Sequence, residues 1–220
     1  MAASIEPHVP GSDTSMDLPI SPDSVKGFLD PEEGAALHRL ATQGARLGPC
    51  LEVGSYCGKS TLYLGTACRE SGTLLYAVDH HRGSEEHQPG EGYHDPELYD
   101  ASAGLMDSFP AFRDTLRRAA LEDAVVPIVA PSALAARHWC CPLGTVFIDG
   151  GHSLEAAMSD YRAWAPHVAP GGLLLIHDIF PDPADGGQAP YTIWKLALAS
   201  GLFADEGRVK TLGVLRRVPK

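Results

Sequence analysis

The sequence predicts a doubly wound α/β domain, in which a mostly parallel sheet of seven strands is covered by helices on both faces. Two observations lead to this fold class. Short apolar runs alternate with longer amphipathic stretches from residue 50 to residue 199, as expected of strand–helix–strand units. The last two apolar segments have no helical stretch between them, which predicts an antiparallel hairpin at one edge of the sheet. We therefore expect six parallel strands and one antiparallel strand.

The first predicted element is a helix that begins after Asp30. Asp30 is a favourable N-cap residue, Pro31 suits the first helical position, and two acids follow in the first turn. Apolar residues then recur at helical spacing, and a Gly-Pro pair at 48–49 ends the helix. The later strands are expected at 50–53, 73–78, 125–129, 145–148, 173–176, 207–210 and 212–216. The later helices are expected at 60–69, 111–120, 132–139, 154–164 and 191–199.

One domain, residues 25–220, accounts for all of these elements. Residues 1–24 are rich in Pro, Ser and Asp without apolar periodicity, so we expect a flexible arm, which is compatible with a homodimer. Residues 83–110 interrupt the alternation with seven acids and no Lys or Arg. We expect this segment to be a lid or insert loop on the substrate side. A solvated excursion that takes part in dimer contacts is the alternative.

Composition excludes several function classes. The 220 residues include 17 Lys and Arg against 28 Asp and Glu, a net charge of −11, which argues against nucleic-acid binding by phosphate neutralisation. No window approaches the roughly 18 apolar residues that cross a bilayer, and the N-terminus does not resemble a secretory signal. The five cysteines form no CxxC pair, so we expect reduced thiols in a cytoplasmic protein.

A glycine-containing turn follows the first predicted strand, in the run Leu-Glu-Val-Gly-Ser-Tyr-Cys-Gly-Lys-Ser of residues 51–60. Glycines let the backbone approach a ligand, and the N-terminus of the next helix offers free N–H groups. The pattern is weak alone, because the third glycine of a dinucleotide fingerprint is misplaced. A tight turn without a ligand is the alternative.

An acid closes the next predicted strand, in the run Tyr-Ala-Val-Asp of residues 76–79. At the carboxyl end of a parallel strand, Asp79 can accept both hydroxyls of a ribose. Read by itself, Asp79 is equally a solvated residue at a strand end. Combined with the glycine turn, it predicts an adenosine-type ligand.

Two further strands end in polar residues on the same expected rim. Val-Phe-Ile-Asp-Gly-Gly-His spans 146–152, and Pro-Gly-Gly-Leu-Leu-Leu-Ile-His-Asp spans 170–178. Asp149, His177 and Asp178 can converge on one divalent cation, and carboxylates with a single imidazole suit Mg²⁺ or Mn²⁺, with Fe²⁺ or Zn²⁺ as further options. Alternatively, His177 and Asp178 cap their strand and bond to neighbouring loops.

Together these four motifs resemble the class I S-adenosylmethionine-dependent methyltransferases. The similarity covers residues 27–218 and is closest to the small-molecule O-methyltransferases that act on macrolide sugars, with the metal-dependent catechol enzymes more distant. The resemblance implies a Rossmann-like sheet and S-adenosylmethionine as cofactor. The cofactor-binding residues that it implies are Glu52, Gly54, Ser55, Tyr56, Gly58, Ser60, Asp79, His80, Ala130 and Ser132. The metal ligands that it implies are Asp149, His177 and Asp178, although the relatives carry an acid at the position of His177.

His152 is the expected catalytic base, acting beside Asp149. The catechol enzymes carry a lysine at this position, and an imidazole suits proton abstraction near neutral pH. A histidine that caps the helix before Leu154 is the alternative. The resemblance thus implies metal-assisted methylation of a hydroxyl on a small molecule. Two other hypotheses stay open: a metal-independent N- or S-methyltransferase, and a non-catalytic protein with the same fold.

Overall fold

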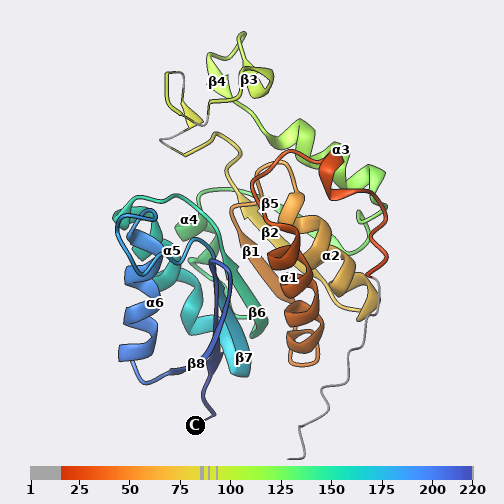
Figure 1. The fold of residues 1–220 in the computed structure, drawn as a ribbon. Coiled ribbons are helices and arrows are strands. Elements are labelled where there is room, and N and C mark those ends of the chain that lie inside the picture. Colours follow the sequence, from red (N-terminus) through yellow and green to blue (C-terminus); the bar gives the residue numbers. More distant parts are fainter. Residues whose placement is uncertain (1–15, 85–86, 89, 93, 220) are drawn as a thin grey trace, which may run out of the picture.

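Figure 1 shows the fold in a computed structural model, which describes residues 16–84, 87–88, 90–92 and 94–219. Seven strands form one sheet in the order β5-β2-β1-β6-β7-β9-β8. Only β9 runs antiparallel to its neighbours, β7 and β8, so six strands of this sheet point one way and one points the other. The predicted sheet is confirmed. Its strands are β1 (Cys50–Val53), β2 (Leu75–Asp79), β5 (Val125–Val129), β6 (Leu143–Ile148), β7 (Val168–Ile176), β8 (Phe203–Val209) and β9 (Leu212–Arg217).

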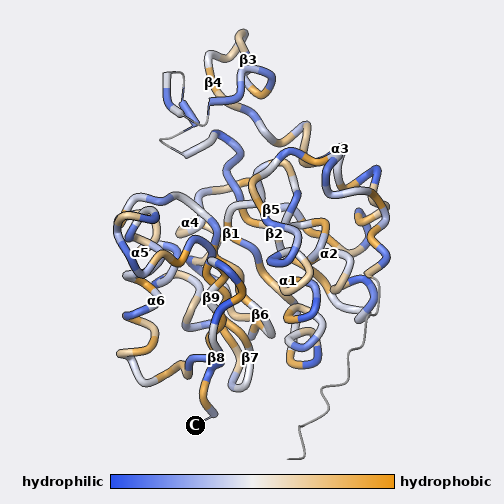
Figure 2. The backbone as a smooth tube through the Cα atoms, viewed as in Figure 1, coloured by the Kyte–Doolittle hydropathy of each residue, from blue (hydrophilic) through white to orange (hydrophobic). Residues whose placement is uncertain are grey.

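Helices cover both faces of this sheet, and each face has its own hydrophobic core. The first core joins the sheet to α1, α2 and α3, and the second joins it to α4, α5 and α6. Figure 1 shows these two helical layers on opposite sides of the strands, and in Figure 2 hydrophobic residues follow the strands between them. The helices are α1 (Pro31–Gly44), α2 (Lys59–Glu70), α3 (Phe109–Arg118), α4 (Ser132–Ala136), α5 (Leu154–Trp164) and α6 (Ala189–Ala199).

The helix caps follow the chemistry of the sequence. The Asp30 side chain accepts a hydrogen bond of 2.8 Å from the backbone N–H of Glu32, which fixes the start of α1 as predicted. Ser153 caps α5 by accepting from the backbone N–H of Ala156 at 3.2 Å. Ser153 therefore fills the capping role that was the alternative for His152.

The largest differences from the predicted boundaries are in β7, β8 and α4, whereas the starts of β2, β6 and α6 and both ends of α3 move by two residues. β7 begins at Val168 rather than at 173, and it passes through Pro-Gly-Gly at 170–172, where the sequence gives no strand signal. β8 begins at Phe203 rather than at 207. Its first residues carry no sequence signal, because this edge strand is largely exposed and lacks an apolar alternation. α4 ends at Ala136, three residues early. None of these differences moves the carboxyl ends of the central strands.

Those carboxyl ends define the position of the site. Val53 lies in register with Val78 on one side and Ile148 on the other, and Ile148 pairs with Ile176. The residues that follow these four strand positions therefore share one rim of the sheet. Residues 83–110, the predicted lid, contribute a short 3-10 helix η3 (Pro96–Leu98) and a two-stranded hairpin, β3 (Tyr99–Asp100) and β4 (Leu105–Met106). This hairpin projects beyond the rim in Figure 1.

Parts of two predicted segments fall outside the described residues: residues 1–15 of the arm, and residues 85–86, 89 and 93 of the lid. The described end of the arm contains a 3-10 helix η1 (Pro22–Ser24), and its residues Met16, Leu18 and Ile20 pack against the first core. Among the helices within the described ranges, none has the length and apolar character needed to cross a bilayer. The 3-10 helix η4 (Ala165–His167) links α5 to β7.

Candidate active site

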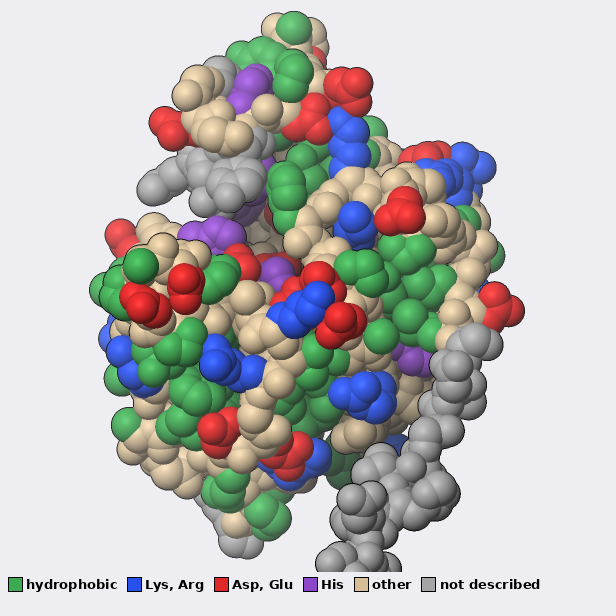
Figure 3. All heavy atoms as spheres, in the orientation of Figure 1, with side chains coloured by type: hydrophobic (Ala, Val, Ile, Leu, Met, Phe, Trp, Pro, Cys, Tyr) green, Lys and Arg blue, Asp and Glu red, His purple; other side chains and the backbone are tan. Residues whose placement is uncertain are grey.

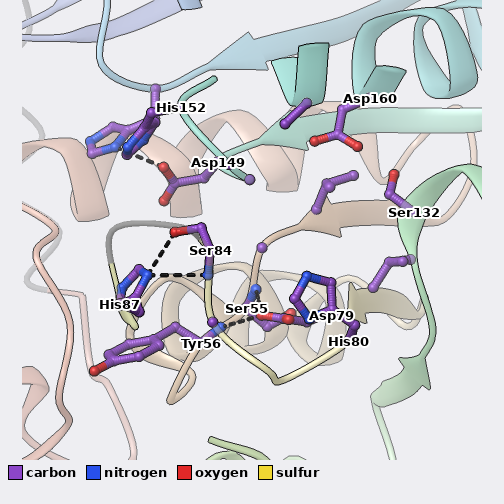
Figure 4. Close-up of a pocket in the computed structure, with 18 of the residues that line it drawn as sticks. Ser55, Tyr56, Asp79, His80, Ser84, His87, Ser132, Asp149, His152 and Asp160 are labelled. Carbon is purple, nitrogen blue, oxygen red and sulfur yellow. Dashed lines mark hydrogen bonds and ion pairs between the residues drawn. The ribbon is translucent and has the colours of Figure 1, made fainter. Parts of the chain in front are cut away.

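A cavity of about 1080 Å³ opens at the carboxyl rim of the sheet. Figure 3 shows a hollow beneath the β3–β4 hairpin, with histidine and acidic side chains at its edge. Figure 4 shows the polar groups that face this space. Its walls come from the segment before α1, the β1–α2 turn, the end of β2, the start of α4 and the loops after β6 and β7. The residues that line it lie within 26–29, 53–60, 78–84, 87–91, 130–133, 149–160 and 177–178, together with Ser108.

The β1–α2 turn forms one wall, and its backbone requires glycine at Gly54. A Cβ at Gly54 would lie 2.0 Å from the carbonyl oxygen of Asp149, and φ is +87° there. Gly58 also has a positive φ and stands at the N-cap of α2, although it does not line the cavity. Tyr56 adopts a φ of +47°, so the turn holds strained backbone at the cavity wall.

Glu52 lies beneath this turn rather than on the cavity wall. Its side chain is fully buried, and Oε2 accepts a hydrogen bond of 2.6 Å from the Thr61 hydroxyl. Burial raises the pKa of Glu52 to about 7. Glu52 Oε1 and the nearby Ser55 Oγ are buried without a hydrogen-bond partner. Ser60 lines the cavity and lies close enough to Glu52 to act against the rise of its pKa.

Asp79 connects the end of β2 to the glycine turn. Its Oδ2 accepts from the backbone N–H groups of Ser55 at 3.0 Å and Tyr56 at 2.8 Å, and Oδ1 accepts from His81 at 2.7 Å. A carboxylate offers about four lone-pair positions, so one position on Oδ1 is left for a ligand. His80, the next residue, is exposed and lines the same part of the cavity.

The wall next to His80 comes from Ala130 to Ser132 and from α5. Ser132 Oγ accepts a hydrogen bond of 2.7 Å from the Trp164 indole N–H. Asp160, which the sequence analysis did not single out, also lines the cavity here and is only 6% exposed. Burial raises its pKa to about 6, although Ser132 acts in the opposite direction. The sequence carried one signal for Asp160, because this acid lies on the same helical face as Ala157 and Trp164, both of which are buried.

Asp149, His152 and Asp178 meet at the opposite end of the cavity. His152 Nε2 lies 3.1 Å from Asp178 Oδ2. One ligand atom from each of the three residues lies within 4.8 Å of the others. Asp178 adopts a φ of +58°. Burial alone would raise the pKa of Asp178, but His152 and His177 outweigh it and lower that pKa.

His177 is close to this group but belongs to a different cluster. Its Nδ1 lies 3.1 Å from Asp149 Oδ1, and its Nε2 lies 2.9 Å from Glu33 Oε2 on α1. Burial alone would lower the pKa of His177, but the surrounding carboxylates raise it to about 11. Both ring nitrogens of His177 are thus engaged by carboxylates, one from Asp149 and one from Glu33. His152, rather than His177, is the histidine whose ligand atom lies with those of Asp149 and Asp178 within 4.8 Å, and the metal role of His177 stays a prediction.

Glu33 is the second residue that the sequence analysis missed, since it was read only as an acid in the first turn of α1. Its Oε1 accepts from the backbone N–H and the hydroxyl of Thr211, at 2.8 and 2.7 Å. Burial alone would raise the pKa of Glu33, but hydrogen bonds from His177 and Thr211 lower it to about 2. Glu33 therefore ties α1 to the ends of β7 and β8. No sequence signal links it to His177, which is 144 residues away.

The described part of the predicted lid is attached to the segment before α1. Lys26 Nζ donates to Asp95 at 2.5 Å and to Glu97 at 2.6 Å. The rings of Tyr56 and His87 lie 5.3 Å apart, and Phe28 stacks on Tyr56 at 6.4 Å. All three rings line the cavity, so these contacts put aromatic groups on its wall.

Comparison with known proteins adds three solved structures with the same fold. An O-methyltransferase from Bacillus cereus in complex with SAH is 19% identical, with a TM-score of 0.59 over 90% of this chain and 86% of that chain. An SAH-bound methyltransferase from Podospora anserina is 13% identical, with a TM-score of 0.62 over 88% and 80%. The O-methyltransferase TomG from Streptomyces achromogenes, involved in tomaymycin synthesis and bound to SAM, is 15% identical, with a TM-score of 0.57 over 88% and 82%.

A family model described as a methyltransferase domain matches residues 51–179. The match starts in β1, just before the glycine turn, and ends just after His177 and Asp178. It therefore contains every residue of the cavity wall described above except those contributed by the segment before α1.

Proposed function

Because this chain belongs to the S-adenosylmethionine-dependent methyltransferase domain family, we propose that it transfers a methyl group from S-adenosylmethionine to a hydroxyl group of a small molecule. The observation that carries the proposal is the contact between His152 and Asp178 on the wall of the same cavity that the glycine turn and Asp79 line. Bound S-adenosylmethionine supplies a methyl group carried on a sulfonium. The protein must then hold an acceptor oxygen in line and remove its proton.

The other residues of the cavity wall fit this cofactor. The volume of about 1080 Å³ is at the upper limit of ordinary ligand pockets, so cofactor and acceptor have room together. Gly54 lets the turn pack closely against the backbone of Asp149 and Gly150 at the cavity wall, and Glu52 and Ser55 retain polar atoms without partners beneath that turn. We assign the methionine end of the cofactor to the turn and Ser60, its ribose to Asp79, and its adenine to His80, Ala130 and Ser132.

His152 is the proposed catalytic base. In the tautomer that donates its Nε2–H to Asp178, the imidazole of His152 carries its basic lone pair on Nδ1. Asp178 orients the ring and stabilises the imidazolium that forms. His152 accepts the hydroxyl proton while the acceptor oxygen bonds to the methyl carbon, and the electron pair of the broken C–S bond stays on sulfur.

A divalent cation is the second part of the proposal, and the clustering of Asp149, His152 and Asp178 favours it. Two carboxylates and an imidazole suit Mg²⁺ or Mn²⁺. Bound there, the ion supplies a positive charge that lowers the pKa of an acceptor hydroxyl. In that arrangement His152 is a ligand rather than the base, so chelation distinguishes the two roles. A metal-free base mechanism is unaffected by EDTA, whereas the cation arrangement loses activity and regains it with Mg²⁺ or Mn²⁺.

The experiment supplies the protein with S-adenosylmethionine and a panel of acceptors, namely catechols, sugars with free hydroxyls, amines and thiols. Methyl transfer is measured as the release of S-adenosylhomocysteine. We expect turnover with a hydroxyl acceptor. His152→Ala should lower turnover by about 10²- to 10⁴-fold and leave S-adenosylhomocysteine affinity unchanged. His138→Ala, an exposed histidine away from the cavity, is the matched control. Turnover only with amines or thiols would establish the alternative acceptor class, and unchanged turnover in His152→Ala would remove His152 from its role.

A further inference from the structure

His81 is a buried histidine that the proposed mechanism does not use, and it follows Asp79 by two residues. It is 2% exposed, and its backbone N–H donates to Asp79 Oδ1 at 2.7 Å. The other two donors to Asp79, the N–H groups of Ser55 and Tyr56, come from the glycine turn and bind Oδ2 (Figure 4). The N–H of His81 is thus the donor that fixes Oδ1, the oxygen with a lone pair left for a ligand.

The backbone of His81 adopts a conformation that few residues other than glycine adopt. Its φ is +58°, in the left-handed region, where histidine, asparagine and aspartate occur more often than other non-glycine residues. Strained backbone of this kind persists where the surrounding structure fixes it. The direction of the His81 N–H therefore depends on what holds this residue, and its ring is the part that the surroundings hold.

The His81 ring is anchored near the end of the lid. Its Nδ1 lies 2.8 Å from the Ser108 hydroxyl oxygen, and the Ser108 N–H donates to the His81 carbonyl at 3.1 Å. The rings of Phe109 and Phe112 pack against it, with centroids 5.0 and 5.2 Å away. Burial lowers the pKa of His81, although nearby carboxylates act in the opposite direction. The ring is therefore uncharged at pH 7, and a hydrogen bond and two aromatic contacts hold it.

We propose that His81 is a positioning residue for Asp79. Its ring, anchored on Ser108, holds the N–H of residue 81 against Oδ1 and keeps the remaining lone pair of that oxygen directed at the ribose of the cofactor. This inference rests on the proposed function, because it requires the ribose of S-adenosylmethionine to bind Asp79. Residue 81 precedes the lid and Ser108 lies near its end, so the anchor joins the base of the lid to the carboxylate that binds the ribose.

The test separates the ribose contact from the rest of cofactor binding. Isothermal titration measures the affinities of S-adenosylhomocysteine and of its 2′,3′-dideoxy analogue, which lacks both ribose hydroxyls. The wild type should bind S-adenosylhomocysteine about 10²-fold more tightly than the analogue. His81→Leu removes the hydrogen bond of the ring and disfavours the left-handed backbone, so this preference should fall below about 10-fold. The affinity for the analogue should change by less than about 3-fold, because the analogue makes no ribose contact.

Two further variants and a control make the test specific. His81→Asn tolerates a positive φ and its side-chain amide can reach Ser108, so it should retain the preference within about 3-fold. Ser108→Ala removes the partner of the ring and should lower the preference as His81→Leu does. His167→Leu is the matched control, because His167 is a partly buried histidine beside Trp164 and outside the cavity wall, and it should leave the preference unchanged.

Three results would overturn the inference. A full preference in folded His81→Leu and Ser108→Ala would show that Asp79 keeps its orientation without the ring. Equal weakening of both ligands in these variants would leave His81 with a structural role alone. Equal affinity of the wild type for the two ligands would remove the ribose contact that His81 is proposed to support. Absence of S-adenosylhomocysteine binding to the wild type would instead refute the proposed function itself. Circular dichroism verifies folding, and Ser108→Ala decides the test if His81→Leu does not fold.

Discussion

Removal of the Glu33 side chain should destabilise the protein far more than removal of its neighbour Glu32. Glu33 is 3% exposed and accepts bonds from His177 and from both the N–H and the hydroxyl of Thr211. Glu33→Ala leaves a buried imidazolium with one carboxylate fewer and strands the Thr211 N–H. Breaking a buried pair in this way costs about 3–5 kcal/mol, which corresponds to roughly 6–20 °C in melting temperature for a chain of this size.

Glu32 is the matched control. It occupies the same helical turn, but its side chain is 72% exposed and contacts Lys210 only at 3.4 Å. An exposed pair of this kind contributes below about 1 kcal/mol. Urea unfolding of the wild type, Glu32→Ala and Glu33→Ala measures both effects. Free energies of unfolding for the two variants that agree within about 1 kcal/mol would refute the structural role of Glu33.

The same pair predicts a pH dependence. The folded-state pKa of Glu33 is lowered from 4.5 to about 2, so its stabilisation is complete above about pH 4.5 and is lost as the pH falls from there through 2. The folded-state pKa of His177 is raised to about 11, so its stabilisation is complete below about pH 6.5 and is lost as the pH rises toward 11. The free energy of unfolding should therefore decline between pH 6.5 and 9, and less steeply in Glu33→Ala. A flat profile in the wild type would contradict the assignment of His177 as an imidazolium.

Two further predictions concern the glycine turn. Gly54→Ala puts a Cβ 2.0 Å from a carbonyl oxygen at a φ of +87°, so we expect the free energy of unfolding to fall by about 2–5 kcal/mol and S-adenosylhomocysteine binding to be lost. The control Gly72→Ala, at φ +67° with open space around it, should cost only about 1 kcal/mol. Equal losses of stability in the two variants would contradict the close approach at Gly54. Glu52→Gln removes a carboxyl whose folded-state pKa of about 7 exceeds its ordinary value. The free energy of unfolding of the wild type should therefore fall by about 3 kcal/mol relative to that of the variant as the pH rises from 4.5 to 7. A stability difference between the two proteins that stays constant across that pH range would argue against a buried, titrating Glu52.

The sequence was sufficient to predict the fold because its strands are buried and its turns carry glycine. β1, β5 and α5 have the predicted boundaries, since each is bounded by clear breaks in apolar pattern. β8 was placed too late because an exposed edge strand needs no apolar alternation. The beginning of β7 was missed because strand pairing there overrides the unfavourable Pro-Gly-Gly sequence.

The site was predictable where function depends on strand ends and unpredictable where it depends on distant partners. Gly54, Asp79, Asp149 and Asp178 lie on the cavity wall because parallel strands end on one rim. Which histidine joins Asp149 and Asp178 depends on Glu33, because Glu33 binds the His177 ring. Nothing in the local sequence around residue 33 indicates a partner 144 residues away.

Asp160 escaped notice for a similar reason. A single acid in an amphipathic helix is ordinarily solvent-exposed. In the folded chain it is nevertheless 6% exposed and lies beside Gly150 and Ser132. Sequence patterns report the faces of individual elements, whereas this carboxylate gains its environment from three separate elements.

Titration of S-adenosylhomocysteine into the purified wild-type protein, with and without Mg²⁺ or Mn²⁺ after chelation, tests the central claim most directly. We predict saturable binding of one ligand per chain with micromolar affinity, abolished by Gly54→Ala. Cation binding that is lost in Asp149→Asn would place the ion at Asp149, His152 and Asp178. A wild-type protein that takes up no S-adenosylhomocysteine under any of these conditions would contradict the assignment of the cavity as a cofactor site.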